Sequence, residues 1–137
     1  MKRIVLGALA LSLLSGAAFA QSSPYALRPE ALAIGSGTKT TAATAGAATL
    51  NKLSGKITTE ALTTAAGASY TLTITNSLIT AADIPFASVA FGTNTTGNTV
   101  ISRVTPGAGS LTIVIRNIDA AVAFNGTLVV SFGTLKN

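Results

Sequence analysis

The chain has 137 residues, of which 48% are hydrophobic and 9% are charged, and its formal net charge is +5 at pH 7. It contains no cysteine and no histidine, which excludes disulfides, thiolate and imidazole metal ligands, and the most common general base. The seven basic residues that follow residue 20 are scattered, without the clusters and stacking aromatic residues of a nucleic-acid surface. We therefore expect no nucleic-acid partner and no cofactor.

Residues 1–20 have the composition of a secretory signal peptide. Two basic residues precede an apolar run that ends at Leu14, and this run is about half as long as the roughly 20 residues of a membrane-spanning helix. An A-x-A motif follows, so the expected cleavage site comprises Ala18, Ala20 and Gln21. Because no second long apolar run occurs, we expect a secreted protein, periplasmic or extracellular, with no membrane span after signal cleavage.

Residues 21–37 contain two prolines and end in Gly-Ser-Gly, a composition that predicts an extended linker. Residues 38–137 then have the length of a single domain. The beginning of this domain, 38–49, is rich in threonine and alanine and predicts one weak strand, because threonine favours an extended backbone. We expect residues 38–48 to pair with the exposed sheet edge of a neighbouring copy.

Strand patterns are clearer after residue 49. Segment 70–77, YTLTITNS, alternates hydrophobic and polar residues most regularly, whereas 60–69 is a connection with room for one helical turn. Further short strands are expected at 86–91, 100–105, 111–116 and 128–132. Turn residues separate these segments, and no long amphipathic helix is present. The pattern predicts an all-β fold, a single antiparallel, jelly-roll-like β-sandwich of about six to eight short strands.

The carboxylates are Glu30, Glu60, Asp83 and Asp119, each alone in its segment. A glycosidase-like pair formed in space from Glu60, Asp83 or Asp119 is one catalytic arrangement left open, and solvated loop carboxylates are the simpler interpretation. Asp83 and Asp119, together with loop carbonyls, are weak candidates for a calcium site. We expect no enzyme, no catalytic residue and no metal site.

Two glycine-rich runs, 35–38 and 106–110, superficially resemble phosphate-binding loops. Neither is followed by the lysine and helix start of a P-loop, so both are interpreted as turns. Asn94 and Asn125 begin sequences that match the glycosylation sequon. Behind a bacterial-looking leader, we interpret both matches as chance.

Threonine alternates along segment 70–77 and forms a row on one strand face, at Thr71, Thr73 and Thr75. Such a row can order water against ice only when many stacked strands repeat it, so we interpret it as the wet face of a sheet. Four phenylalanines are interpreted as core residues rather than as a carbohydrate platform: Phe86, Phe91, Phe124 and Phe132.

Several segments taken together resemble a β-domain of tailed-phage and prophage structural proteins. They are TLNK (49–52), GKITT (55–59), TTAAGASYTLTITNS (63–77) and RNIDAAVAFNGT (116–127). With the GSGT run, the resemblance covers about residues 35–137. It implies a small β-sandwich module with a head-fibre-like or decoration-like role at a virion surface. It further implies self-association and display rather than catalysis, because the matching motifs are structural.

Three functions remain open from the sequence. The first is a non-enzymatic, secreted structural or surface-display subunit that forms homo-oligomers, with a cell-surface or virion component as a further partner. The second is a secreted binding module for a glycan or a cell-envelope component, which would use loops 92–99 and 117–126. The third is an enzyme built on two of the isolated carboxylates.

Overall fold

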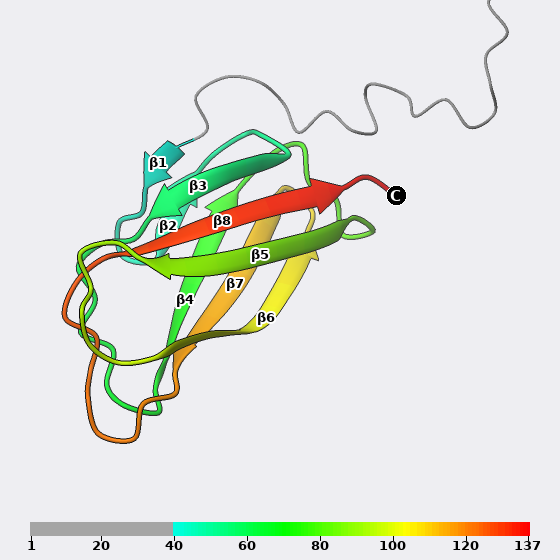
Figure 1. The fold of residues 1–137 in the computed structure, drawn as a ribbon. Helices are drawn as coiled ribbons and strands as arrows, with labels where there is room; N and C mark the ends of the chain where they lie inside the picture. Colours follow the sequence, from blue (N-terminus) through cyan, green and yellow to red (C-terminus); the bar gives the residue numbers. More distant parts are fainter. Residues whose placement is uncertain (1–39) are drawn as a thin grey trace, which may run out of the picture.

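The computed structural model of the protein describes residues 40–137, which form eight strands and no helix (Figure 1). The strands are β1 (Thr40–Ala42), β2 (Ala47–Thr49), β3 (Ser54–Thr58), β4 (Ser69–Thr75), β5 (Ile84–Phe91), β6 (Thr99–Gly107), β7 (Ser110–Asn117) and β8 (Leu128–Leu135). The predicted signal peptide, its cleavage site and the predicted linker of residues 21–37 lie outside the described residues. Between residues 40 and 137, no helix is long and apolar enough to cross a bilayer.

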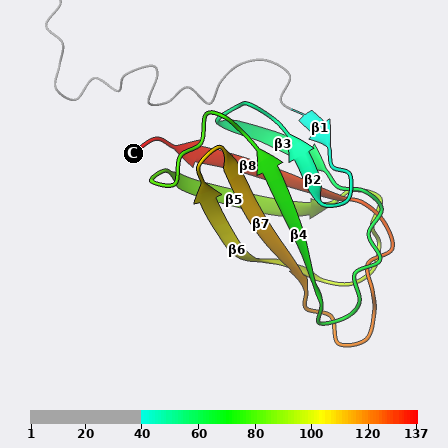
Figure 2. The same cartoon turned by 180° about the vertical axis from the view of Figure 1, so that it is seen from behind.

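The strands form two open four-stranded sheets that pack face to face (Figure 1, Figure 2). Sheet A has the order β1-β3-β8-β5, and sheet B has the order β2-β4-β7-β6. The prediction of an all-β fold with six to eight short strands is therefore confirmed. β3 pairs with β8 in sheet A and β4 pairs with β7 in sheet B, whereas β6 forms a hairpin with β7 and also contacts β5 of the other sheet.

The prediction that all strands pair antiparallel is wrong for the two short edge strands. β1 runs parallel to β3, and β2 runs parallel to β4. The alternation of side chains is the same in parallel and antiparallel strands, so the sequence pattern carries no information about direction.

The single strand predicted for residues 38–49 is divided into β1 and β2. The chain crosses from sheet A to sheet B through Ala45 and Gly46, whose φ angles are 48° and 75°. A Cβ at Gly46 would lie 2.7 Å from the carbonyl oxygen of Thr71. Glycine is therefore required at this crossing. Residues 40–49 pair with β3 and β4 of their own chain rather than lying free for a neighbouring copy.

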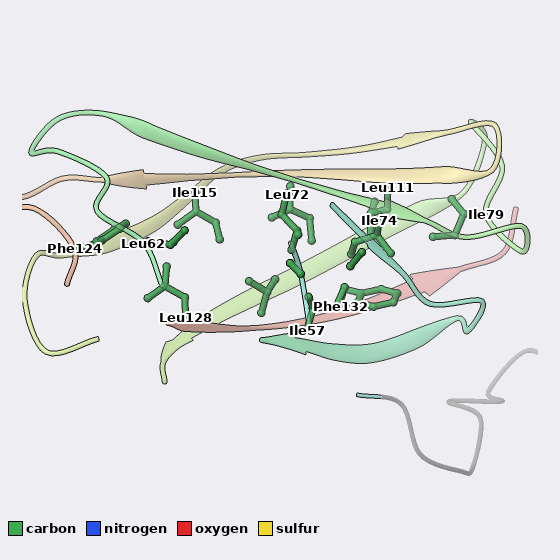
Figure 3. Close-up of a cluster of buried hydrophobic side chains, with 14 residues drawn as sticks. Ile57, Leu62, Leu72, Ile74, Ile79, Leu111, Ile115, Phe124, Leu128 and Phe132 are labelled. Atoms are coloured by element: carbon green, nitrogen blue, oxygen red, sulfur yellow. The ribbon is translucent and has the colours of Figure 1, made fainter. Parts of the chain in front are cut away.

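Side chains that alternate along the strands of both sheets form one hydrophobic core (Figure 3). The central strands contribute most of it, with Leu72 and Ile74 from β4, Leu111, Ile113 and Ile115 from β7, and Leu128, Val130 and Phe132 from β8. Each such side chain stabilises the fold by about 1.5–3 kcal/mol when it is fully buried. The connection of residues 60–69, which was expected to have room for a helical turn, contains no helix.

Two of the four phenylalanines predicted to be core residues are not in the core. Phe124 and Phe132 are buried, but the side chains of Phe86 and Phe91 are 53% and 45% exposed. Both exposed residues lie on β5, the edge strand of sheet A. The ring of Phe86 lies over Gly133 of β8, where a Cβ would overlap it. Phe86 thus covers backbone that glycine leaves bare.

The threonine row of β4 lies on the outer face of sheet B, where all three threonines are exposed. Hydroxyl-bearing residues continue across this face, because Thr73 pairs with Thr112 of β7, which in turn pairs with Thr105 of β6. Thr75 likewise pairs with Ser110. Short hydroxyl side chains therefore cover the middle of the sheet.

Both long free edges carry features that interrupt strand addition. β5 contains Pro85, which cannot donate a backbone hydrogen bond. β6 contains Pro106 and an irregularity between Ile101 and Arg103, where the pairing with β7 shifts register. Proline and bulges at an edge disfavour pairing with another chain. Addition of a further strand at these two edges is therefore disfavoured.

Candidate functional site at the loop end

The two ends of the sandwich are built from different segments. At the end that we call the loop end lie residues 59–68, 92–98 and 117–127 (Figure 1, lower left). At the opposite end, which we call the tail end, lie residues 50–53, 76–83, 108–109 and 135–137. The loop end thus includes both loops that the sequence marks as candidates for ligand binding.

The loops of residues 92–98 and 117–127 are joined by reciprocal hydrogen bonds. The backbone N–H groups of Thr93 and Thr127 each donate to the hydroxyl of the other residue, both at 2.9 Å. The backbone N–H of Asn125 donates to Asn94 Oδ1 at 2.7 Å. Asn125 Oδ1 accepts the backbone N–H of Thr95, and its Nδ2 donates to Thr95 Oγ1, both at 2.8 Å. The two loops therefore form one body.

Asn117, at the end of β7, is the centre of this body and is completely buried. Its Nδ2 donates to the carbonyl oxygens of Thr64 and Val122, at 3.2 and 2.8 Å. Its Oδ1 accepts the backbone N–H groups of Asn98 and Asp119, at 3.2 and 3.1 Å. One side chain thus connects all three segments of the loop end.

Two glycines allow the segments to approach this closely. A Cβ at Gly126 would lie 2.7 Å from both the backbone nitrogen of Asn94 and the carbonyl carbon of Thr93. Gly97, with φ of 74°, lies against the buried ring of Phe124, which a Cβ would meet at 2.8 Å. The loop end is therefore packed as tightly as a core, although it consists of connections.

Asp119 has a structural role within the loop end. Its Oδ1 accepts the backbone N–H groups of Ala121 and Val122, both at 2.9 Å, and its Oδ2 accepts Asn98 Nδ2 at 3.3 Å. The two backbone hydrogen bonds hold the pKa of the Asp119 carboxyl below its usual value. The carboxylate therefore stays ionised and fixes the turn that follows β7.

Glu60 holds the crossing between β1 and β2. Its two carboxylate oxygens accept the backbone N–H of Gly46 at 2.8 Å and the hydroxyl of Tyr70 at 2.9 Å. Burial, assisted by the neighbouring carboxylate, raises the pKa of the Tyr70 phenol. Tyr70 therefore remains protonated and continues to donate this hydrogen bond.

Asp83, whose side chain is buried, forms an ion pair with the exposed Lys136 at the tail end. Its Oδ2 lies 2.6 Å from Lys136 Nζ and accepts the backbone N–H of Thr80 at 2.8 Å. Lys136 Nζ also donates to the carbonyl oxygen of Leu78. The hydrogen bond from Lys136 is the main cause that lowers the pKa of Asp83 from 3.8 to about 2. This pair fastens the end of the chain to the connection between β4 and β5.

We expect the Asp83 pair to give the protein an acid-sensitive stability. Because the folded pKa is below the unfolded value, the stabilisation is fully present above about pH 4 and is lost as pH falls towards 2. The Tm of Asp83→Asn should therefore fall below that of the wild type above pH 4, and the difference should shrink towards pH 2. Thermal unfolding followed by circular dichroism between pH 2 and 6 measures this. Lys52→Met is the control, because Lys52 has no ion-pair partner among the described residues. The change in Tm between pH 2 and pH 6 should be the same in this variant as in the wild type.

The structure separates the two aspartates that the sequence offered as a calcium pair. Asp83 lies at the tail end and Asp119 at the loop end, so these two cannot share an ion. Glu60 is bound to Gly46 and Tyr70, and Glu30 lies outside the described residues. Within residues 40–137, no three acidic side chains gather into a potential metal site.

The asparagine network at the loop end is not visible in the sequence. Asn94 and Asn125 stand there as sequon matches, yet Asn94 is buried and its Nδ2 donates to the carbonyl oxygen of Thr96 at 2.6 Å. The only feature of the sequence that could have indicated this network is the frequency of asparagine in segments that also contain glycine and threonine. That composition predicts turns, and it does not predict that separate turns bond to each other.

Comparison of the chain with protein-family models, with curated proteins and with solved structures finds no match. Its function is therefore inferred from the arrangement of its own residues.

Proposed function

We propose that the chain is a non-enzymatic, secreted structural subunit that associates with copies of itself for surface display, similar to phage virion-surface β-modules. The observation that carries the proposal is that each described carboxylate accepts hydrogen bonds from the fold itself. Glu60 fixes a strand crossing, Asp83 fastens the chain end and Asp119 fixes a turn. Groups used in this way shape a rigid surface and are poorly placed to exchange protons with a substrate.

The surface supports the same proposal. The outer face of sheet B presents short hydroxyl side chains, and its long edge is interrupted by proline and a register shift. Such a module can be placed beside other chains without uncontrolled edge pairing. The resemblance of residues 35–137 to tailed-phage and prophage modules points to a virion or cell surface as the place of display, and the leader of residues 1–20 points to export.

The test is multi-angle light scattering on the mature chain, Gln21 to Asn137, purified from the periplasm without an N-terminal tag. A discrete oligomer is the expected result, and a monomer at every concentration would contradict self-association. Mass spectrometry of the same material tests export. The expected mass is that of a chain beginning at Gln21, and a retained leader would contradict secretion.

A second candidate is a binding module for a glycan or a cell-envelope component. It is favoured by the rigidity of the loop end, because loops that are already ordered lose little conformational entropy on binding. An NMR titration with cell-wall oligosaccharides distinguishes the two functions. Chemical-shift changes confined to residues 92–99 and 117–126 would support the binding module. A spectrum that does not change on any addition would contradict it and favour the structural subunit.

A further inference from the structure

The exposed large hydrophobic side chains of residues 40–137 are unevenly distributed. Four lie at or near the tail end: Leu78, Ile84, Phe86 and Leu135. The other four lie at or near the loop end: Phe91, Val100, Ile118 and Val122. Single exposed hydrophobic residues are normal on a protein surface, whereas their concentration in patches marks interaction sites.

The broad faces between the two ends have a different character. Midway along the outer face of sheet A, Ser88 of β5 pairs with Ser131 of β8, which pairs with Lys56 of β3. Midway along the outer face of sheet B lie the paired Thr73 and Thr112. Small polar and charged side chains remain well hydrated. The large exposed hydrophobic side chains therefore lie towards the two ends, and three of those near the tail end stand on the outer face of sheet A.

Three residues of the tail-end patch are neighbours on the outer face of sheet A. Ile84 and Leu135 are register partners on β5 and β8, and their side chains are 59% and 50% exposed. Phe86 follows on the same face of β5 and is supported by Gly133 beneath it. Leu78 lies in the connection between β4 and β5, and its carbonyl oxygen accepts a hydrogen bond from Lys136, the residue after Leu135. The patch is thus presented by paired strands and a fastened loop.

The loop-end patch is equally well supported. Ile118, 57% exposed, directly follows the buried Asn117, and its backbone N–H donates to the carbonyl oxygen of Asn98 at 2.8 Å. Val122 is held through its carbonyl oxygen by Asn117 and through its N–H by Asp119. Because these apolar side chains stand on a fixed backbone, little ordering is required when they are buried against a partner.

Charge decides which ends fit together. Lys52 at the tail end and Asp119 at the loop end have no ion-pair partner within the described residues. At the tail end, Asp83 offsets the charge of Lys136, so Lys52 leaves a net charge of +1. At the loop end, Glu60 and Asp119 stand against Arg116, which keeps its charge while it donates to the carbonyl oxygen of Gly67, and the net charge is −1. Contact between two tail ends opposes two net positive surfaces, and contact between two loop ends opposes two net negative surfaces. Contact between a loop end and a tail end brings opposite charges together.

We propose that copies of this chain associate end to end, with the loop-end patch of one copy against the tail-end patch of the next. This inference rests on the self-association proposed above and specifies its surface. A contact between two different patches is heterologous, so each copy keeps one free patch of each kind. The assembly is therefore a ring if the rotation between copies closes, and a filament if it does not.

Three single variants test the proposal, each adding one aspartate at an exposed position. Ile118→Asp blocks the loop end and Ile84→Asp blocks the tail end, because a carboxylate is costly to bury in an apolar contact. Ser88→Asp is the matched control on the middle of the same strand as Ile84. By light scattering, both end variants should be monomeric, and the control should form the same oligomer as the wild type. Circular dichroism verifies that all three remain folded.

Mixing the two end variants gives the sharpest result. Ile118→Asp retains an intact tail end and Ile84→Asp retains an intact loop end, so their equimolar mixture should form a one-to-one dimer that grows no further. A mixture that stays monomeric would overturn the end-to-end arrangement, as would loss of the oligomer in Ser88→Asp. If the wild type is oligomeric and both end variants keep the same oligomer, this inference fails and the structural subunit stands. A monomeric wild type overturns both.

Discussion

Asn117→Ala should lower the free energy of unfolding by about 3–5 kcal/mol, the largest loss that we expect from a polar substitution in this chain. The side chain makes four hydrogen bonds at the loop end. Each is worth roughly 1 kcal/mol when made, and a buried partner left unsatisfied costs about 1–3 kcal/mol. Urea denaturation followed by fluorescence or circular dichroism measures the change.

Two further variants separate the hydrogen bonds of Asn117 from its volume. Asn117→Asp keeps the shape but replaces the donor to Thr64 and Val122 with an acceptor, and should be at least as unstable as Asn117→Ala. Asn98→Ala removes one exposed side-chain bond of 3.3 Å and should cost less than about 1 kcal/mol. A loss for Asn117→Ala no greater than that for Asn98→Ala would contradict the central position of Asn117.

Gly126→Ala should destabilise the protein by about 2–4 kcal/mol through overlap with the backbone of the neighbouring loop. A Cβ there meets backbone atoms of Thr93 and Asn94 at 2.7 Å, and backbone cannot move aside as a flexible side chain can. The reciprocal bonds between the two loops should weaken together. Hydrogen exchange at the amides of Thr93 and Thr127 should therefore accelerate in the variant.

Gly109→Ala is the matched control for Gly126→Ala. Gly109 has φ of 75° and open space around its Cβ position, so its substitution tests backbone conformation alone, at a cost of about 1 kcal/mol. Its effect should also stay at the tail end and leave exchange at Thr93 unchanged. Equal losses of stability from both substitutions would contradict the close approach at Gly126.

The hydrophobic pattern was sufficient to predict a β-sandwich and the buried face of its central strand β4. It did not predict which side chains of the edge strand β5 are exposed. Leu72 and Ile74 lie in the core because strict alternation in β4 defines a buried face, whatever its neighbours are. Phe86 lies in a segment with only one polar residue, so both faces of β5 have hydrophobic residues and the pattern does not show which face is buried. In the fold, Phe86 faces solvent. Its position depends on which strand lies beside β5 and on Gly133 in that strand. Such information is distributed over distant segments.

The candidate site could likewise be predicted only in part, because its hydrogen bonds join segments that are distant in the sequence. Residues 92–99 and 117–126 are recognisable as loops from their glycine and asparagine content. That Asn117 is buried depends on the meeting of three connections up to 53 residues apart, since its bond to Thr64 spans that separation. Local composition marks where chains turn, and only the assembled fold decides which turns bond to each other.

The network around Asn125 also bears on how long the molecule remains chemically intact. Asn125-Gly126 is the type of dipeptide in which the backbone nitrogen of glycine attacks the asparagine amide and forms a cyclic imide. Here both polar atoms of that amide are bound to Thr95, and Gly126 is confined between neighbouring backbones. The side chain is thereby kept from rotating freely towards the attacking nitrogen. The hydrogen bonds that shape the loop end therefore also protect this asparagine from cyclisation.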